Sequence, residues 1–139
     1  MINIHTDGSC IHNANVSGSA IGPGGYAAIL FKDDHHTPFH TITGGHEATT
    51  NNIMEIGAAL ESLKYLDSNH LHDTVTIYSD SQYVINSINT WLKGWEQNNF
   101  RKIKENWEAL GREYSEILVK SIYNRCIEVI KTKGGNTGY

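Results

Sequence analysis

The chain has few cysteines, no long apolar run and no surplus of basic residues, and each shortage excludes a class of protein. Its two cysteines, Cys10 and Cys126, are too few and too far apart for a disulfide framework, so we expect reduced thiols in a cytoplasmic protein. No apolar run approaches the roughly 20 residues that span a bilayer. The first residues also lack the basic and then apolar pattern of a secretory signal. We therefore expect one globular domain, residues 1–139, with no membrane partner.

The shortage of positive charge bears on nucleic-acid binding. There are 11 Lys and Arg against 15 Asp and Glu, a net charge of −4 at pH 7 with neutral histidines. A nonspecific nucleic-acid binder usually has a basic surplus, so phosphate contacts here would need a local patch. A group of acids reserved for metal ions would lower the total in the same way. The histidines show no ligand-like spacing on a clear helix, and we expect most of them in loops and on the surface: His5, His12, His35, His36, His40, His46, His70 and His72.

What the chain does have is three short islands that each hold one carboxylate. The islands are TDGSC at Thr6–Cys10, TTNNIME at Thr49–Glu55 and YSDSQY at Tyr78–Tyr83. Their acids are Asp7, Glu55 and Asp80. Isolated acids in such surroundings are more often capping or salt-bridged groups. Buried carboxylates repel one another and are costly to desolvate unless a cation joins them, so three of them together indicate a divalent metal site.

The hydrophobic pattern predicts an α/β fold. Strands are expected at residues 2–7, 25–31, 38–43, 75–79 and 127–132, and helices at 51–66, from 81 onward and at 100–118. Short loops between the first three strands favour antiparallel neighbours. In the first helix, Ile53, Ile56, Leu60 and Leu63 form the expected core row, and Glu55 lies at its margin. This order of elements predicts a mixed sheet with helices on its faces.

The three islands, in this order, resemble the ribonuclease HI family, and the resemblance runs over almost the whole chain. GPGGYAAIL at residues 22–30 and SQYVINSINTWLKGW at residues 81–95 strengthen it. The resemblance implies a ribonuclease H-like fold with a mixed five-stranded sheet flanked by helices. It also implies a metal-dependent endoribonuclease that cleaves the RNA strand of RNA–DNA hybrids and leaves 5′-phosphate and 3′-hydroxyl ends.

The resemblance further assigns the catalytic metal ligands. Asp7, Glu55 and Asp80 match the family's first three ligands for two Mg²⁺ or Mn²⁺ ions. In that assignment Asp7 bridges the two ions, Asp80 lies mainly on the water-activating side and Glu55 on the other.

The same resemblance implies a set of substrate contacts: Gly8, Ser9, Cys10, Thr50, Asn51, Asn52, Gln82, Trp91, Lys93 and Trp95. Backbone groups of the first three are candidate partners of the ribose 2′-hydroxyl, which separates RNA from DNA. Asn51 and Gln82 would read the minor groove and nearby bases or ribose, and Thr50 would hold a DNA phosphate. Helix capping is the alternative for the two asparagines. For the Trp–Lys–Trp stretch, the alternative is packing of the tryptophans with a solvated lysine.

The end of the chain departs from the family pattern. The family has a fourth carboxylate on a final helix, and before it a loop histidine, whereas KGGNTGY follows the last expected strand here. We therefore expect a C-terminally short ribonuclease H domain that lacks the usual final helix. Asn136, a second copy of the chain or a partner are alternative sources of the missing ligand. Because Mn²⁺ binds such sites more readily, we expect stronger activity with Mn²⁺ than with Mg²⁺.

Two other functional hypotheses remain beside the leading one. A non-catalytic module on the same fold, binding hybrids or double-stranded RNA, is the first, although a pure binder has no use for mutually repelling acids. Another nuclease of the same superfold, such as a junction resolvase, is the second, since fold alone does not decide function. We expect a monomer that acts on an RNA–DNA hybrid. The loop between Cys10 and Gly22 is longer than usual and is either a gate or a neutral insertion.

Overall fold

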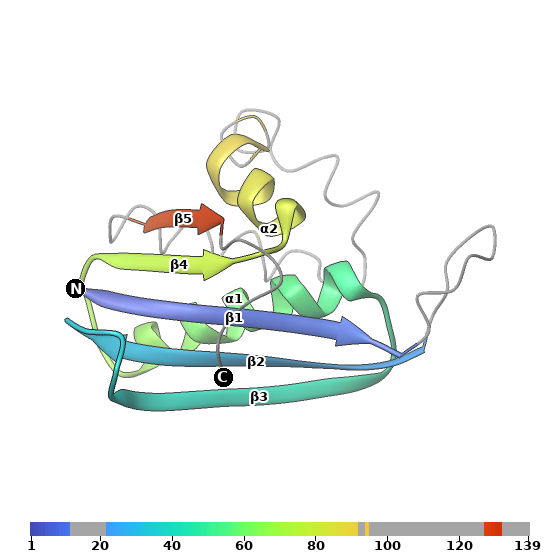
Figure 1. The fold of residues 1–139 in the computed structure, drawn as a ribbon, viewed down its shortest axis with the longest axis horizontal. Helices are drawn as coiled ribbons and strands as arrows, with labels where there is room; N and C mark the ends of the chain where they lie inside the picture. The colour runs from blue at the N-terminus through green and yellow to red at the C-terminus, as the bar shows by residue number, and fades with distance from the viewer. Residues whose placement is uncertain (12–21, 92–93, 95–126, 132–139) are drawn as a thin grey trace.

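The described part of the protein is built on one mixed sheet. In the computed structural model, residues 1–11, 22–91, 94 and 127–131 are described. They form a five-stranded sheet in the order β3-β2-β1-β4-β5, with α1 running behind it (Figure 1). The strands are β1 (Ile2–Cys10), β2 (Gly22–Lys32), β3 (Pro38–Thr49), β4 (Val75–Ser79) and β5 (Ile127–Lys131). The helices are α1 (Asn51–Ser68), α2 (Gln82–Asn86) and the π-helical turn η1 (Ser87–Trp91).

The strand directions follow from the connections. Strands β1 and β2 pair antiparallel, as do β2 and β3, which a short turn joins. Helix α1 then carries the chain from β3, at one edge, to the other side of β1, where β4 runs parallel to β1 and β5 runs parallel to β4. This arrangement confirms the predicted mixed five-stranded sheet. In the part of the chain that the structure describes, no helix has the length and apolar character needed to cross a membrane.

Three strands are longer than their sequences predict. Strand β1 was expected to end near Asp7, but Gly8, Ser9 and Cys10 continue it by pairing with β2. Strand β2 was expected over residues 25–31 and runs from Gly22 to Lys32. Strand β3 likewise continues beyond residue 43 to Thr49. Glycine and serine have low strand propensity, so these segments read locally as loops. Pairing with a neighbouring strand overrides that local preference.

Helix α1 and the sheet enclose the core. The fully buried aliphatic side chains, each 0% exposed, are Ile2, Ile4, Leu30, Ile56, Leu63, Leu66, Val75, Ile77 and Val84. Burying a side chain of this size stabilises the fold by about 1.5–3 kcal/mol. The predicted helix row is buried at three of its four positions. Ile53 is only half-buried, and Met54 takes the buried position at that end of the helix.

Some expectations fall outside the described residues. These are the helix over residues 100–118, the missing final helix, Asn136, Cys126 and the loop between Cys10 and Gly22. Cys10 itself is a free, buried thiol, as expected. Of the seven histidines in the described ranges, five are exposed; the half-buried ones are His5 and His40.

Candidate active site

The parallel pairing of β1 and β4 brings the first two acids together. His5 on β1 is the register partner of Tyr78 on β4, and Asp7 and Asp80 each follow two residues later. Because parallel strands run in the same direction, both carboxylates reach the same end of the sheet. Asp80 follows directly after the last residue of β4, where the sequence places it.

Glu55 reaches these two acids from the first turns of α1. Thr50 is the N-cap of this helix, and its hydroxyl accepts a hydrogen bond from the Ile53 amide at 3.3 Å. The helix backbone lies directly on β1 at Gly8. A side-chain Cβ at Gly8 would lie 2.5 Å from the Glu55 amide nitrogen and 2.6 Å from the Met54 carbonyl oxygen. Gly8 therefore permits the close approach that carries Glu55 to the end of the sheet.

The three carboxylates form one cluster. One oxygen from each of Asp7, Glu55 and Asp80 lies within 4.8 Å of the others. Asp7 and Asp80 are exposed and Glu55 is half-buried, at the margin of the helix's buried face as predicted. Burial and the negative charges of Asp80 and Asp7 raise the pKa of Glu55 from 4.5 to about 7, although a backbone hydrogen bond from Gly8 lowers it. The Glu55 Oε2 atom is buried without a hydrogen-bond partner.

This arrangement has the properties of a divalent-cation site. Mutual repulsion and the unpartnered Oε2 oxygen of Glu55 are unfavourable for a metal-free protein. Both are relieved by a divalent ion with a preference for oxygen ligands. Among the described residues, no other group of three or more His, Cys, Asp or Glu side chains has this proximity.

Two serine hydroxyls shape the turn that holds Asp80; the sequence predicts a helix that opens at Ser81, but it does not single out Ser79. The Ser79 hydroxyl accepts a hydrogen bond from the Ser81 amide at 3.1 Å, so the chain folds around Asp80. The Ser81 hydroxyl in turn accepts from the Val84 amide at 3.3 Å and caps α2. The signal in the sequence is the Ser–Asp–Ser triplet, because serine side chains commonly bond to backbone groups two or three residues away.

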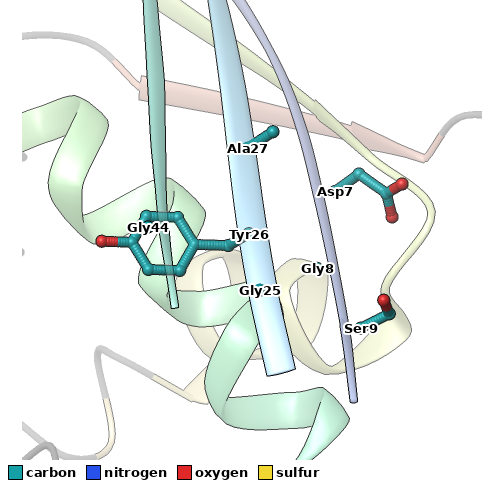
Figure 2. Close-up of a pocket in the computed structure, with 7 residues that line it drawn as sticks. All are labelled: Asp7, Gly8, Ser9, Gly25, Tyr26, Ala27 and Gly44. Carbon is teal, nitrogen blue, oxygen red and sulfur yellow. The ribbon is translucent and has the colours of Figure 1, made fainter. Parts of the chain in front are cut away.

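A shallow cavity of about 300 Å³ adjoins Asp7. Figure 2 shows Asp7 and Ser9 projecting from the same side of β1, while the Tyr26 ring lies over Gly44. The lining residues are mostly small: Asp7, Gly8, Ser9, Gly25, Tyr26, Ala27 and Gly44. The small side chains of Gly8, Ser9 and Gly25 leave the strand backbone beside Asp7 open to a ligand. The sequence reading missed the contribution of β2 and β3 to this surface.

Of the predicted substrate contacts, Asn51 has the most defined environment. Its Oδ1 atom accepts a hydrogen bond from the Cys10 amide at 2.6 Å, which ties the start of α1 to the end of β1. The Cys10 thiol points inward and donates to the carbonyl oxygens of Thr49 (3.3 Å) and Gly22 (3.5 Å). The Cys10 amide is therefore already bonded to Asn51, which leaves the Asn51 amide nitrogen as the group able to donate to a ligand.

The remaining predicted contacts are more dispersed. Asn52 is exposed on α1, and Gln82 is exposed at the start of α2, where its amide donates to Asn86 Oδ1 at 2.8 Å. The backbone of Trp91 ends η1. Lys93, Trp95 and the side chain of Trp91 lie outside the described residues, so the basic and aromatic stretch stays a prediction.

The fold and the acid cluster together define a class of protein. A mixed α/β sheet with three converging carboxylates has the donor set of the divalent-metal-dependent nucleases, which act on phosphodiesters through such ions. The family is identified by sequence. The RNase H family model matches residues 1–138. The ribonuclease HI of Helicobacter pylori is 45% identical over 117 residues, which cover 84% of this chain and 71% of that protein. The chain belongs to the ribonuclease H family.

Solved structures confirm the fold. The structure of LC9-RNase H1, a type 1 RNase H with the type 2 active-site motif, aligns with a TM-score of 0.70 at 18% identity. That alignment covers 99% of this chain and 64% of LC9-RNase H1. LC11-RNase H1 in complex with an RNA/DNA hybrid aligns with a TM-score of 0.62 at 18% identity, over 96% of this chain and 86% of that one. The family resemblance and the fold class read from the sequence are thus both confirmed.

Proposed function

We propose that this protein is a metal-dependent endoribonuclease that hydrolyses the RNA strand of RNA–DNA hybrids and leaves 5′-phosphate and 3′-hydroxyl ends. The observation that carries the proposal is the convergence of Asp7, Glu55 and Asp80 within 4.8 Å in a chain of the ribonuclease H family. The hybrid found with a protein of the same fold supports the choice of substrate.

The residues of the cluster fit the metal that this chemistry requires. All donors are carboxylate oxygens, which suits Mg²⁺ or Mn²⁺ better than ions that prefer nitrogen or sulfur. Asp7, Glu55 and Asp80 would hold the ions, and the unpartnered Oε2 atom of Glu55 supplies a buried oxygen for this purpose. When bound, a pair of such ions activates the attacking water and stabilises the leaving oxygen.

The chain's own residues position these carboxylates. Gly8 lets the backbone of α1 lie on β1, and its hydrogen bond favours the ionised form of Glu55. The hydroxyls of Ser79 and Ser81 hold the turn on both sides of Asp80. The backbone that carries Glu55 and Asp80 is thus held before substrate binds, which limits the reorganisation needed during catalysis.

Recognition of the RNA strand is proposed for the surface beside Asp7. Ser9 is exposed on the same side of β1 as Asp7, next to the open backbone of Gly25. A 2′-hydroxyl both donates and accepts hydrogen bonds, so backbone groups and a serine hydroxyl can recognise it. The amide nitrogen of Asn51 would donate to an acceptor in the minor groove, because its oxygen is already bonded to Cys10.

Cleavage of an end-labelled RNA–DNA hybrid tests the proposal. The chain is assayed in Mg²⁺ and separately in Mn²⁺, with Asp80→Asn as the inactive variant. Glu47→Gln is the matched control, because Glu47 is an exposed acid on β3 outside the cluster. We expect the wild type and the control to cut the RNA strand only, and Asp80→Asn to cut neither strand.

Other outcomes would favour other functions. Hybrid binding without cleavage in either metal would replace the proposal with a non-catalytic binding module. Cleavage of the DNA strand or of a branched junction would indicate another nuclease of the same superfold. A monomeric, cytoplasmic protein is part of the same proposal, and the elution volume in size-exclusion chromatography tests the first of these properties.

A further inference from the structure

Two histidines that are 30 residues apart in the sequence meet beside the last register pair of β1 and β4, two residues before Asp7 on β1. His5 lies on β1, and His35 lies in the turn between β2 and β3. The Nε2 atom of His5 is 3.0 Å from the Nδ1 atom of His35. The two ring planes are nearly perpendicular, at 81°, with centroids 5.3 Å apart.

The ring of His5 is held in place by aromatic neighbours. It stacks on Tyr78, its register partner on β4, with centroids 4.6 Å apart and an interplanar angle of 8°. Phe31 on β2 packs against it edge to face at 5.5 Å. His35 also contacts the Tyr78 ring edge to face, at 5.1 Å. These contacts fix the direction in which the His5 nitrogen points, as a rigid ligand requires.

The turn that carries His35 is fixed as well. The carboxylate of Asp34 accepts hydrogen bonds from the amides of His36 (3.0 Å) and Thr37 (3.2 Å). On the other side, the Asn3 side chain donates to the Asp34 carbonyl oxygen at 3.4 Å, which ties the turn to β1. The backbone on both sides of His35 is therefore held, while its ring remains exposed to solvent.

The distance between the two nitrogens suits a shared metal ion. With metal–nitrogen bonds of about 2.0–2.1 Å, nitrogens 3.0 Å apart subtend an angle of about 91–97° at the metal. That angle is close to the 90° between neighbouring ligands in square or octahedral coordination, whereas a tetrahedral ion would need the nitrogens about 3.3 Å apart. We propose that His5 and His35 form a second metal site, selective for divalent transition ions such as Ni²⁺ or Cu²⁺ that prefer imidazole nitrogen.

This site would offer the ion fewer protein ligands than the acid cluster does. Within the described ranges, no third His, Cys, Asp or Glu joins the two histidines as a possible ligand. The remaining coordination positions would therefore hold water, and the ion would exchange readily with solvent. Without an ion the two rings satisfy each other through their hydrogen bond, so the pair is stable when empty.

Calorimetric titration with Ni²⁺ tests the proposal, with the untagged chain in saturating Mg²⁺ so that the carboxylates are occupied. His35→Gln removes one ligand from an exposed turn. His36→Gln is the matched control, since it changes the next exposed histidine of the same turn. Asp7→Asn reports on any binding at the acid cluster instead.

We expect one Ni²⁺ per chain for the wild type, His36→Gln and Asp7→Asn, and binding at least about tenfold weaker for His35→Gln. His5→Gln should show the same loss. Three results would overturn the proposal: no Ni²⁺ binding by the wild type, unchanged affinity in His35→Gln, or loss of binding in Asp7→Asn. Circular dichroism spectra of the variants verify that each remains folded.

Discussion

Two neighbouring groups of side chains are built by opposite principles, although His5 and Asp7 stand only two residues apart on β1. In the acid cluster three carboxylates face one another, and a buried oxygen of Glu55 has no partner. In the histidine pair of His5 and His35 the two imidazoles satisfy each other, and Tyr78 and Phe31 pack around His5. The acid cluster is unfavourable without a cation, whereas the histidine pair is stable by itself.

This difference shows where the fold tolerates a destabilising arrangement of side chains. Local consistency is the rule in a folded protein, and departures from it concentrate at functional sites. The acid cluster is such a departure, since neutral side chains at these positions would be more stable in the absence of metal. The pair of His5 and His35 is no such departure, because its two rings satisfy each other. The following predictions test the contrast, from the largest expected effect to the smallest.

The largest contrast is expected in catalysis. Asp80→Asn should lower the rate of hybrid cleavage by at least about a thousandfold, which corresponds to about 4 kcal/mol of transition-state stabilisation. His35→Gln should leave the rate unchanged, because His35 lies outside the group of three carboxylates. Single-turnover cleavage rates measure both. A comparable loss in both variants would show that the histidine pair and the acid cluster act as one site.

A second contrast concerns the backbone contact beneath Glu55. Gly8→Ala places a Cβ against the backbone of Met54 and Glu55, and overpacking of this kind costs about 1–3 kcal/mol. Thermal unfolding should therefore occur at a lower temperature, together with weaker cleavage as Glu55 is displaced. Gly25→Ala is the control, since its Cβ would meet only the Gly44 carbonyl oxygen at an acceptable 3.4 Å. Equal melting temperatures for the two variants would contradict this account of Gly8.

The charge of Glu55 should make the metal-free protein sensitive to pH. Its pKa is raised from 4.5 to about 7, so the folded state favours the neutral form. Stability is then fully retained below about pH 4.5 and falls as the pH rises towards 7. Because the side chain is partly solvated, we expect a loss of only about 1 kcal/mol, less than the full shift implies.

Glu55→Gln isolates this effect. Urea denaturation in EDTA at a series of pH values should show the wild type losing stability relative to the variant between about pH 4.5 and 7. Above that range, Mg²⁺ should restore the stability of the wild type more than that of the variant. Parallel pH curves for the two proteins would show that Glu55 is not strained by its neighbours.

The smallest effect is expected at Asn51. Replacing it with alanine removes the acceptor of the Cys10 amide and the proposed donor to the minor groove. Loss of one such hydrogen bond, about 1 kcal/mol, should raise the KM for the hybrid about fivefold with little change in kcat. Asn52→Ala, at the next and more exposed position of α1, is the control. Equal effects at both positions would show that the Asn51 side chain makes no specific contact with the hybrid.

The sequence was most informative where function requires a residue type. The three acids and their surrounding motifs indicated both the cluster and the family, and the β4 boundaries were predicted as observed. Strand ends were harder to predict. Residues such as Gly8, Ser9, Gly44 and Gly45 have little strand preference of their own, and they become strand only because a neighbouring strand pairs with them.

The sequence alone thus determined the ligand types, the order of elements and the family, because these depend on residue identity and local periodicity. Tertiary structure decided which side chains meet. Only the parallel register of β1 and β4, together with the close contact of α1 at Gly8, joins Asp7, Asp80 and Glu55. Only the folding of the turn between β2 and β3 brings His35 within hydrogen-bonding distance of His5. Such contacts depend on strand pairing between distant segments, whose energy no local window of sequence contains.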